Sequence, residues 1–267
     1  MFKFNFFEEP LEKDIQNCSY EKEFTSDNNC REIIDDIRSD CHVFKSLFIG
    51  NTKFYIKDLE KIGESKSKQF LTSFKDCDVI PALYEGGLKI WECTYDLLLF
   101  LMNNKITFEG KTVLDLGCGC GLLGIFTAMK GAKEVHFQDF NADVLINFTI
   151  PNVQHNQIKS KIKFISGDWK QFESCSVVKN VLYDYILSSE ILYNASNYYK
   201  LYELFNCKLN MSTAEILVAS KSYYFGVGGS VQQFQEYLNK TGKFYCATVW
   251  KTSKGVQREI LSIKFAN

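Results

Sequence analysis

The clearest chemical signal in the sequence is a glycine-rich stretch, Val-Leu-Asp-Leu-Gly-Cys-Gly-Cys-Gly, at residues 113–121. An apolar segment leads into Asp115, and three glycines follow at alternate positions, Gly117, Gly119 and Gly121. Glycine lets the backbone come close to a ligand because no Cβ intervenes. The apolar, helix-like run that follows would leave free backbone N–H groups at the same place. The pattern therefore predicts a loop that cradles a cofactor.

The spacing of the glycines helps to distinguish between cofactors. A dinucleotide-binding fold uses G-x-G-x-x-G, but Leu122 occupies the position of its third glycine. The G-x-G-x-G pattern, with an acid two residues before the first glycine, resembles the first motif of the S-adenosylmethionine (SAM) methyltransferases. Taken alone, this loop also fits a structural turn or a site for another nucleotide.

Acidic and aromatic residues are expected at the ends of the strands that follow. In an open parallel sheet, ligands bind at the carboxyl ends of the strands. Asp139 ends the second predicted strand and could accept both ribose hydroxyls, although a capping role is the alternative. Asp168 ends the third strand and suits the adenine amino group. Trp169 offers a stacking face or belongs to the core.

A second group of residues is expected near a transferred methyl group. Glu190 and Tyr193 form an acid-x-x-aromatic pair after the fourth strand, which should lie beside the first strand. Residues 84–94 contain two adjacent glycines and a tryptophan before an apolar helix, which favours a loop that covers the methionine end of the cofactor. Residues 223–229 add three aromatic residues and a flexible glycine-rich loop. His136 is interpreted as buried structure, and no Ser/His/Asp or Cys/His catalytic set is discernible.

Strand and helix patterns alternate from residue 111 onward. Strands are predicted at residues 112–117, 134–140, 161–166, 183–189, 214–220, 244–250 and 258–265. Helices are predicted at 95–102, 121–130, 142–148 with a kink at Pro151, 198–209 and 231–239. Such alternation predicts an α/β fold with a mostly parallel sheet and helices on both faces. Seven strands that end in an antiparallel hairpin are the arrangement of class I SAM methyltransferases, a Rossmann-like fold.

Composition and charge restrict the other possibilities. Hydrophobic residues make up 46% of the chain, which is enough for a large core, and the net charge of -1 disfavours direct nucleic-acid binding. The ten cysteines are scattered without a C-x-x-C pair, so no metal site is predicted. No secretory signal or membrane span is discernible, because the longest apolar run near a helix covers only residues 97–102. We expect a reduced, intracellular compartment.

The N-terminal part of the chain looks different from the rest. Residues 1–75 are polar and weakly periodic, which favours a mobile arm with some local structure, including a strand at 54–56. Residues 57–68 have nearly balanced charges, as in a solvated linker. The predicted organisation is an N-terminal extension over residues 1–77 and a methyltransferase domain over 78–267.

Four segments together resemble the histidine protein methyltransferase 1 family: residues 78–94, 113–124, 136–141 and 223–229. That family belongs to the seven-strand protein methyltransferases with an acid-x-x-Tyr motif, most of which act on lysine. The resemblance covers about residues 78–265, and the run Glu-Gly-Gly-Leu-Lys-Ile-Trp-Glu-Cys-Thr is more selective than the glycine loop. Two positions depart from the family, since Phe140 stands where tyrosine is usual and Cys120 where serine is usual.

The resemblance implies a SAM pocket, a substrate and a location. Together with Asp115 and Gly119 of the glycine loop, the implied pocket residues are Ile90, Trp91, Glu92, Cys93, Thr94, Gly117, Gln138, Asp139, Phe140, Gly167, Asp168, Trp169 and Ser189. The implied substrate is one histidine of a large-subunit ribosomal protein, and the implied location is nucleus and cytoplasm. We also expect a monomer that does not associate with membranes.

The acceptor decides how much acid–base chemistry is needed. Neutralising lysine at pH 7 costs about 4.6 kcal/mol, because its reference pKa is about 10.4, whereas imidazole at about 6.5 is already mostly neutral. A histidine enzyme therefore needs an acceptor for the second ring N–H more than it needs a strong base. Our hypothesis is that Glu190, Tyr193 or Asn194 orients the imidazole, while Tyr224 and Phe225 enclose it.

Several alternatives remain open from the sequence. The acid-x-x-Tyr motif also fits a lysine methyltransferase, and histidine is preferred only because of the family resemblance. A catalytically silent SAM-fold module is less consistent with three acids, Asp115, Asp139 and Asp168, at the expected ligand positions. A small-molecule methyltransferase remains possible, while the glycine spacing and the terminal hairpin disfavour a nicotinamide oxidoreductase.

Overall fold

The structure is a computed structural model that describes residues 30–33, 43–61, 74, 78–80, 83–211 and 214–266. The first part of the predicted arm, residues 1–29, lies outside the described residues, as does most of the predicted linker, residues 62–68.

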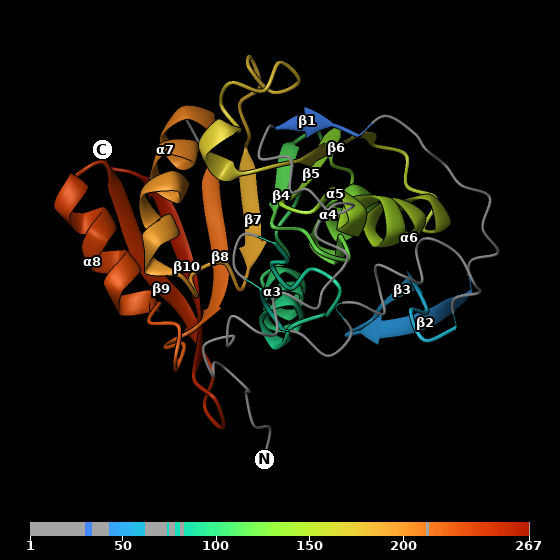
Figure 1. Ribbon diagram of the computed structural model, residues 1–267, viewed down its shortest axis with the longest axis horizontal. Coiled ribbons are helices and arrows are strands. Elements are labelled where there is room, and N and C mark those ends of the chain that lie inside the picture. Colours follow the sequence, from blue (N-terminus) through green and yellow to red (C-terminus); the bar gives the residue numbers. More distant parts are fainter. Residues whose placement is uncertain are drawn as a thin grey trace, which may run out of the picture.

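The described residues form one central sheet of eight strands in the order β1-β6-β5-β4-β7-β8-β10-β9 (Figure 1). Neighbouring strands from β6 to β8 run parallel, and β10 runs antiparallel between β8 and β9. The strands are β1 (Arg31–Glu32), β4 (Thr112–Leu116), β5 (Glu134–Asp139), β6 (Lys161–Ser166), β7 (Tyr185–Ser189), β8 (Glu215–Lys221), β9 (Phe244–Lys251) and β10 (Arg258–Phe265).

All seven predicted strands are present, but the prediction of a seven-stranded sheet was wrong. The additional strand, β1, has two residues and pairs antiparallel with Ser166 and Ile165 of β6. Its partner would otherwise be an edge strand with unpaired backbone groups, and such an edge readily accepts another segment. A strand of two residues is too short to show an alternation of apolar and polar residues, so the sequence gave no signal for β1.

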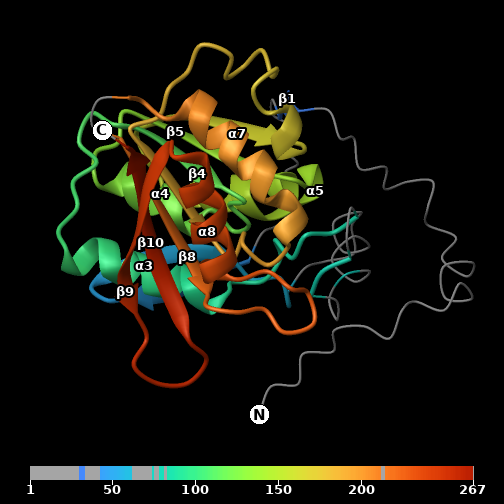
Figure 2. The same cartoon turned by 90° about the vertical axis from the view of Figure 1, so that its left-hand side faces the viewer.

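Helices cover both faces of the sheet (Figure 2). Helices α3, α4 and α6 pack in one core cluster, while α7 and α8 pack in the other. Val113 and Leu114 are neighbours in β4 and are buried in opposite clusters, which explains the continuous apolar pattern of a strand covered on both faces. The helices are α3 (Glu92–Asn103), α4 (Leu122–Met129), α5 (Ala142–Val144), α6 (Ile150–His155), α7 (Tyr198–Lys208) and α8 (Val231–Thr241), with 3₁₀ turns η2 (Trp169–Gln171) and η3 (Ala195–Asn197).

The helical segment after β5 differs in detail from the prediction. A π-helical turn, η1 (Leu145–Thr149), joins α5 to α6, whereas a kink at Pro151 was predicted. Pro151 is the second residue of α6, which continues the helical run of η1, so its missing N–H leaves one carbonyl of the preceding turn without a helical partner. The irregularity is therefore a π turn before the proline.

The N-terminal part also contains a hairpin of β2 (Phe44–Ile49) and β3 (Thr52–Lys57). The predicted strand at residues 54–56 is confirmed within β3. Phe54 and Ile56 are buried in the same core cluster as α3 and α4, so this segment is packed against the domain. Lys57 is buried as well, and the prediction of a solvated linker was wrong at its start. The division of the chain at residue 77 stays a prediction.

Two asparagines of the α6 region attach this hairpin to the rest of the domain. Asn152 accepts a hydrogen bond from the N–H of Lys57 at 2.7 Å and donates to the carbonyl of Cys120 at 2.9 Å. Asn156 accepts from the N–H of Tyr55 and donates to the carbonyl of the same residue. Asn152 is fully buried, so it connects the hairpin directly to the glycine loop.

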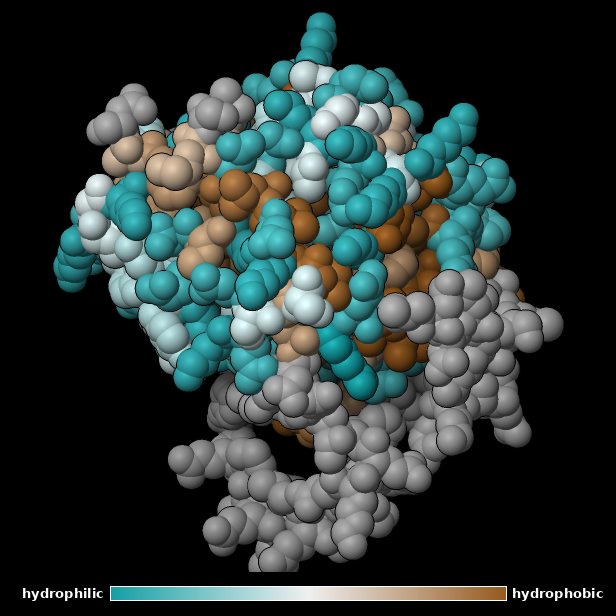
Figure 3. All heavy atoms as spheres, turned by 90° about the horizontal axis from the view of Figure 1, so that it is seen from above, coloured by the Kyte–Doolittle hydropathy of each residue, from teal (hydrophilic) through white to brown (hydrophobic). Residues whose placement is uncertain are grey.

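The surface seen from above is mixed in polarity. Figure 3 shows hydrophilic residues over most of this face, with hydrophobic residues gathered in patches between them. Among the residues that the structure describes, no helix combines the length and the apolar composition needed to cross a bilayer.

We predict that Asn152→Ala lowers the free energy of unfolding by about 2–6 kcal/mol, because it leaves two buried backbone groups unpaired at about 1–3 kcal/mol each. The control is Asn104→Ala, which removes one exposed hydrogen bond to the carbonyl of Phe100. Urea denaturation should separate the two variants clearly. Equal stabilities would contradict the proposed anchoring of the hairpin.

Candidate active site

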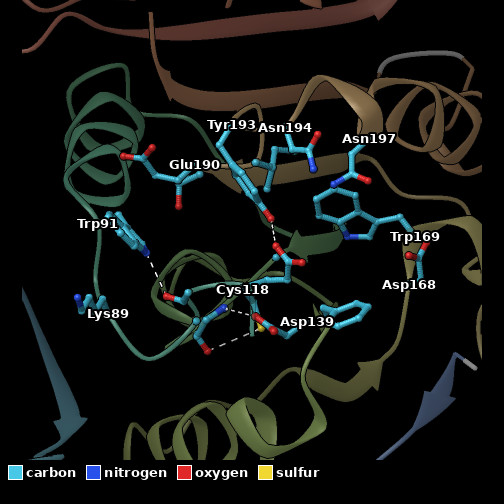
Figure 4. Close-up of a pocket in the computed structure, with 18 of the residues that line it drawn as sticks. Lys89, Trp91, Cys118, Asp139, Asp168, Trp169, Glu190, Tyr193, Asn194 and Asn197 are labelled. Carbon is cyan, nitrogen blue, oxygen red and sulfur yellow. Dashed lines mark hydrogen bonds between the residues drawn. The ribbon is translucent and has the colours of Figure 1, made fainter. Parts of the chain in front are cut away.

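A cavity of about 340 Å³ opens at the carboxyl ends of β4, β5, β6 and β7 (Figure 4). Its walls come from the loop after each of these strands and from the segment before α3. At one end lie Glu190 and Trp91, and at the other lie Asp168 and Trp169. The topology thus brings together the strand-end residues that the sequence predicted to meet.

The glycine loop forms the floor of the cavity. Gly117 and Gly119 have positive φ angles of 65° and 50°, which favour glycine. A Cβ on Gly119 would lie 3.0 Å from the carbonyl oxygen of Gly87, and one on Gly117 would lie 3.1 Å from a methyl carbon of Ile191. The close approach of these segments leaves room only for backbone at Gly117 and Gly119, while Cys118 and Cys120 also border the cavity.

Asp115 lies behind this loop and does not line the cavity. Its side chain is buried, and its Oδ2 accepts a hydrogen bond of 2.8 Å from the N–H of Gly124 in α4. Its Oδ1 has no hydrogen-bond partner among the described residues. Burial raises the pKa of this carboxyl to about 8. The contact that the structure shows for Asp115 is therefore with the first turn of α4.

Gln138, in β5, connects two of the cavity loops from behind the wall. Its Oε1 accepts from the N–H of Gly117 at 3.3 Å and from Nε1 of Trp169 at 2.9 Å. Its amide nitrogen donates to the carbonyl of Gly167 at 2.8 Å. The side chain is fully buried and does not line the cavity. Gln138 therefore fixes the relative positions of the loops after β4 and β6.

Asp139 lies at the middle of the cavity wall, beside Phe140. Its carboxylate accepts hydrogen bonds from the N–H groups of Gly119, at 2.9 Å, and Asn141, at 3.0 Å. Burial raises the pKa of Asp139 to about 6, even though these N–H groups favour the charged form. The carboxylate is thus held in place while it still borders the cavity.

Asp168 and Trp169 border the far end of the cavity together with Lys200. The ammonium group of Lys200 lies 2.7 Å from Oδ2 of Asp168, and the N–H of Lys170 donates to Oδ1 at 2.7 Å. The indole ring of Trp169 is oriented by Gln138. The sequence analysis missed Lys200, because a lysine on a helix surface gives no local signal of its neighbours.

The segment before α3 covers the other side of the cavity. Trp91 donates from its ring nitrogen to the carbonyl of Gly86 at 3.1 Å. The hydroxyls of Thr94 and Ser189 are hydrogen-bonded at 2.8 Å. Tyr193 donates its hydroxyl to the carboxylate of Glu85, which the sequence analysis did not single out. The sequence did contain a signal for Glu85, because this residue begins the selective run at residues 85–94 that carries the family resemblance.

The Glu190 end of the cavity has a buried polar cluster. Glu190 has a φ of 62°, which is unusual for a residue other than glycine, and its Oε2 accepts a hydrogen bond from the hydroxyl of Tyr224. The ammonium group of Lys221 lies 3.7 Å from the other oxygen, Oε1. Burial and the nearby Glu190 raise the pKa of the Cys93 thiol, so this thiol stays protonated.

Two residues predicted at this end, Phe225 and Asn194, lie in contrasting positions. Phe225 is 80% exposed and does not line the cavity, because the loop turns its ring outward against Tyr223, at 4.9 Å between ring centroids. The prediction that it encloses the acceptor is therefore not supported by its position, whereas Tyr224 does lie against Glu190. Asn194 lines the cavity, and its side chain accepts from the N–H of Ser196 at 3.0 Å.

The cavity includes most of the residues that the sequence predicted to bind cofactor or acceptor. Those that line it are Trp91, Thr94, Gly117, Gly119, Asp139, Phe140, Gly167, Asp168, Trp169, Ser189, Glu190, Tyr193 and Asn194. Those that do not are Ile90, Glu92, Cys93, Asp115, Gln138 and Phe225. Asp115, Gln138 and Cys93 lie behind the wall of the cavity. Residues close to each of them in the sequence line the cavity itself.

The fold and the position of the cavity are those of the class I SAM-dependent methyltransferases. A magnesium protoporphyrin IX methyltransferase from Synechocystis, solved with bound SAH, superposes with a TM-score of 0.52 at 14% identity, covering 74% of this chain and 93% of that chain. A TehB-like methyltransferase from Corynebacterium glutamicum gives 0.51 at 12% identity, covering 75% and 98%. These likenesses show the fold alone.

The sequence comparisons narrow the class to a family. A family model described as lysine methyltransferase matches residues 83–240, and the chain belongs to this family. The histidine protein methyltransferase 1 homolog of Mus musculus is 41% identical over 70% of this chain and 59% of its own length. The homolog of Dictyostelium discoideum is 42% identical over 70% and 60%. The chain thus spans about three-fifths of the length of these relatives.

We predict that Asp115→Asn changes how stability depends on pH. The folded-state pKa of about 8 lies above the ordinary value of 3.8, so the wild-type protein should lose stability as pH rises from about 4 to about 8. The asparagine variant keeps an acceptor for Gly124 but cannot ionise. Unfolding free energies measured across this range should therefore fall more steeply for wild type. Parallel pH profiles would contradict the raised pKa.

Proposed function

We propose that this protein transfers a methyl group from SAM to a side-chain nitrogen of histidine in a protein. The observation that carries the proposal is the division of one cavity into two chemically different ends. Asp139, Asp168 and Trp169 border a part suited to a nucleoside, while Glu190 and Trp91 border the opposite end. The similarity to histidine protein methyltransferase 1 homologs supports histidine as the acceptor.

The residues of the cavity fit SAM. The backbone at Gly117 and Gly119 is open to a ligand where a Cβ would meet neighbouring atoms, and Asp139 can accept from ribose hydroxyls. Each oxygen of Asp168 is engaged once, by Lys200 or Lys170, and retains a lone pair for an adenine amino group. When bound, SAM would supply a methyl group activated on a positively charged sulfur.

Glu190 is the residue that we favour for orienting the acceptor. Its Oε1 is buried and has no hydrogen-bond partner among the described residues, which is a costly state for a polar atom. If the carboxylate turned toward the cavity, the N–H of a neutral imidazole would satisfy this oxygen and would leave the other ring nitrogen free to react. Tyr193 already donates to Glu85, and Asn194 holds the turn at Ser196, so both are better suited to shaping the wall.

The chain's own residues would mainly position the reacting groups. Methyl transfer is an in-line displacement, in which the acceptor nitrogen, the methyl carbon and the sulfur must lie on one line at a short distance. Tyr224 fixes the Glu190 carboxylate, and Thr94 and Ser189 join the first turn of α3 to the end of β7. An imidazole acceptor is mostly neutral at pH 7, so no strong base is required.

For the substrate, we propose a large-subunit ribosomal protein, methylated in the cytoplasm or nucleus by a monomeric enzyme. This part rests on the family resemblance. The second candidate acceptor is lysine, which the description of the matching family model favours. The two acceptors differ in charge at pH 7, and one assay distinguishes them.

The proposed acceptor can be tested on purified ribosomal proteins incubated with the enzyme and isotopically labelled SAM. We expect the label on a histidine imidazole when modified peptides are mapped by mass spectrometry. Glu190→Gln, which preserves shape but removes the charge, should lower the rate by about 10²-fold, as expected when the acceptor is no longer held in line with the methyl group. Label confined to lysine would overturn the histidine proposal.

We predict that Asp139→Asn weakens SAM binding by about 1.5–3 kcal/mol, the value of a hydrogen bond to a charged group. Because burial raises the pKa of Asp139 to about 6, wild-type affinity should also fall as pH drops through that value. The variant should bind weakly at all pH values and lack this dependence. Calorimetric titration on both sides of pH 6 measures both effects, and unchanged affinity would remove the ribose assignment.

A further inference from the structure

We propose that Lys221 determines which acceptor this site can use. Its ammonium group holds the Glu190 carboxylate in position for a neutral imidazole and repels the ammonium group of a lysine side chain. The inference rests on the proposed function and adds to it a specificity-determining residue that does not itself react. Lys221 is the last residue of β8, on the strand that neighbours β7 and the Glu190 turn.

The position of Lys221 is unusual for a lysine. The residue is only 5% exposed, and its Nζ lies 3.7 Å from Oε1 of Glu190. The same ammonium group lies 5.1 Å from the ring centroid of Trp91 and 5.6 Å from that of Tyr224. Cation–π attraction to two rings and an ion pair with a buried carboxylate together hold the charge beside the cavity.

Tyr224 links the backbone of Lys221 to the same carboxylate. Its hydroxyl accepts from the N–H of Lys221 at 3.3 Å, lies 2.9 Å from the hydroxyl of Ser220 and donates to Oε2 of Glu190. Glu190 is thereby held from two sides while its backbone keeps a positive φ. A non-glycine residue stays in that conformation only where its surroundings fix it.

The charges around Glu190 nearly cancel. Glu190 faces Lys221, and on α3 the carboxylate of Asp96 forms an ion pair with Arg258 of β10. The remaining acid is Glu92, whose side chain is 59% exposed and lies 3.9 Å from the same Lys221 ammonium group. Among these described residues, Glu190 and Asp96 are each paired with a base, and the one acid in excess, Glu92, is exposed.

This balance favours one acceptor over the other. A lysine acceptor would bring a second ammonium group next to Lys221 in a partly buried place, where like charges repel strongly. That penalty adds to the cost of deprotonating lysine before it can react. A neutral imidazole meets neither penalty, and its N–H can donate to Oε1 of Glu190. Discrimination here works by repelling the competing substrate as well as by binding the preferred one.

The test uses the full chain with Lys221→Met, which keeps an unbranched stem but removes the charge, and Lys221→Arg, which keeps the charge. The substrates are the ribosomal peptide whose histidine the wild type methylates and the same peptide with lysine at that position. For Lys221→Met we expect kcat on the histidine peptide to fall by about 10- to 100-fold through misplacement of Glu190, with KM changed by less than about twofold. The lysine-to-histidine ratio of kcat/KM should rise by about tenfold.

Matched controls separate this role from a structural one. Lys221→Arg should keep the selectivity ratio within about threefold of wild type. Lys264→Met removes another lysine of the same sheet, whose ammonium group lies 3.3 Å from the carboxylate of Glu215. This variant should change neither kcat on the histidine peptide nor the selectivity ratio. SAM affinity from calorimetry should be the same in all variants. If Lys221→Met does not fold, Lys221→Gln replaces it with the same expected change of ratio.

The two proposals fail in distinguishable ways. A wild-type enzyme that binds SAM but methylates no histidine would overturn the proposed function. A wild-type enzyme that methylates histidine, together with a folded Lys221→Met or Lys221→Gln variant whose selectivity ratio is unchanged, would overturn the role of Lys221 alone. The proposed role of Lys221 would also be contradicted if Lys221→Arg had the same selectivity ratio as Lys221→Met. The positive charge would then not be the cause of the selectivity.

Discussion

The site depends on buried carboxylates that hold a glycine loop by its backbone. The N–H of Gly119 donates to Asp139, and the N–H of Gly124 at the start of α4 donates to Asp115. Burying an acid is costly, and the raised pKa values of about 8 for Asp115 and about 6 for Asp139 express that cost. Backbone N–H groups offset part of it. The loop therefore has a fixed shape, and the two cysteines between its glycines, Cys118 and Cys120, border the cavity.

The same loop is also held from the N-terminal side. Asn152 bridges the carbonyl of Cys120 to the N–H of Lys57 in the hairpin. Gln138 bridges Gly117 to the segment at Gly167. Amide side chains suit this task because each one donates and accepts at once, and so can pair two backbone segments without adding charge. The shape of the cavity is consequently set by buried amides as much as by the acids that border it.

Whether a feature of the site could be predicted depends on how far apart in the sequence the interacting residues lie. The glycine pattern and Asp139 could be read locally, because strand ends and turn glycines are encoded by neighbouring residues. Residues that act across the sheet could not be read in the same way. Lys221 appears in the sequence as an ordinary lysine at the end of a strand, and only the fold brings it to Glu190. Phe225 shows the opposite error, since an aromatic residue in a suitable loop turns outward.

The two ends of the cavity hold their acids differently, in a way that matches the ligand proposed for each end. Near Asp139, backbone N–H groups hold an acid whose oxygens suit the neutral hydroxyl donors of a sugar. At Glu190, a phenol and an ammonium group hold the acid, so its charge is compensated before any substrate arrives. A compensated carboxylate can still accept a hydrogen bond, but it attracts a cation only weakly. An acceptor that is already neutral at physiological pH can donate a hydrogen bond to this carboxylate. It does not need the attraction that a cation would need.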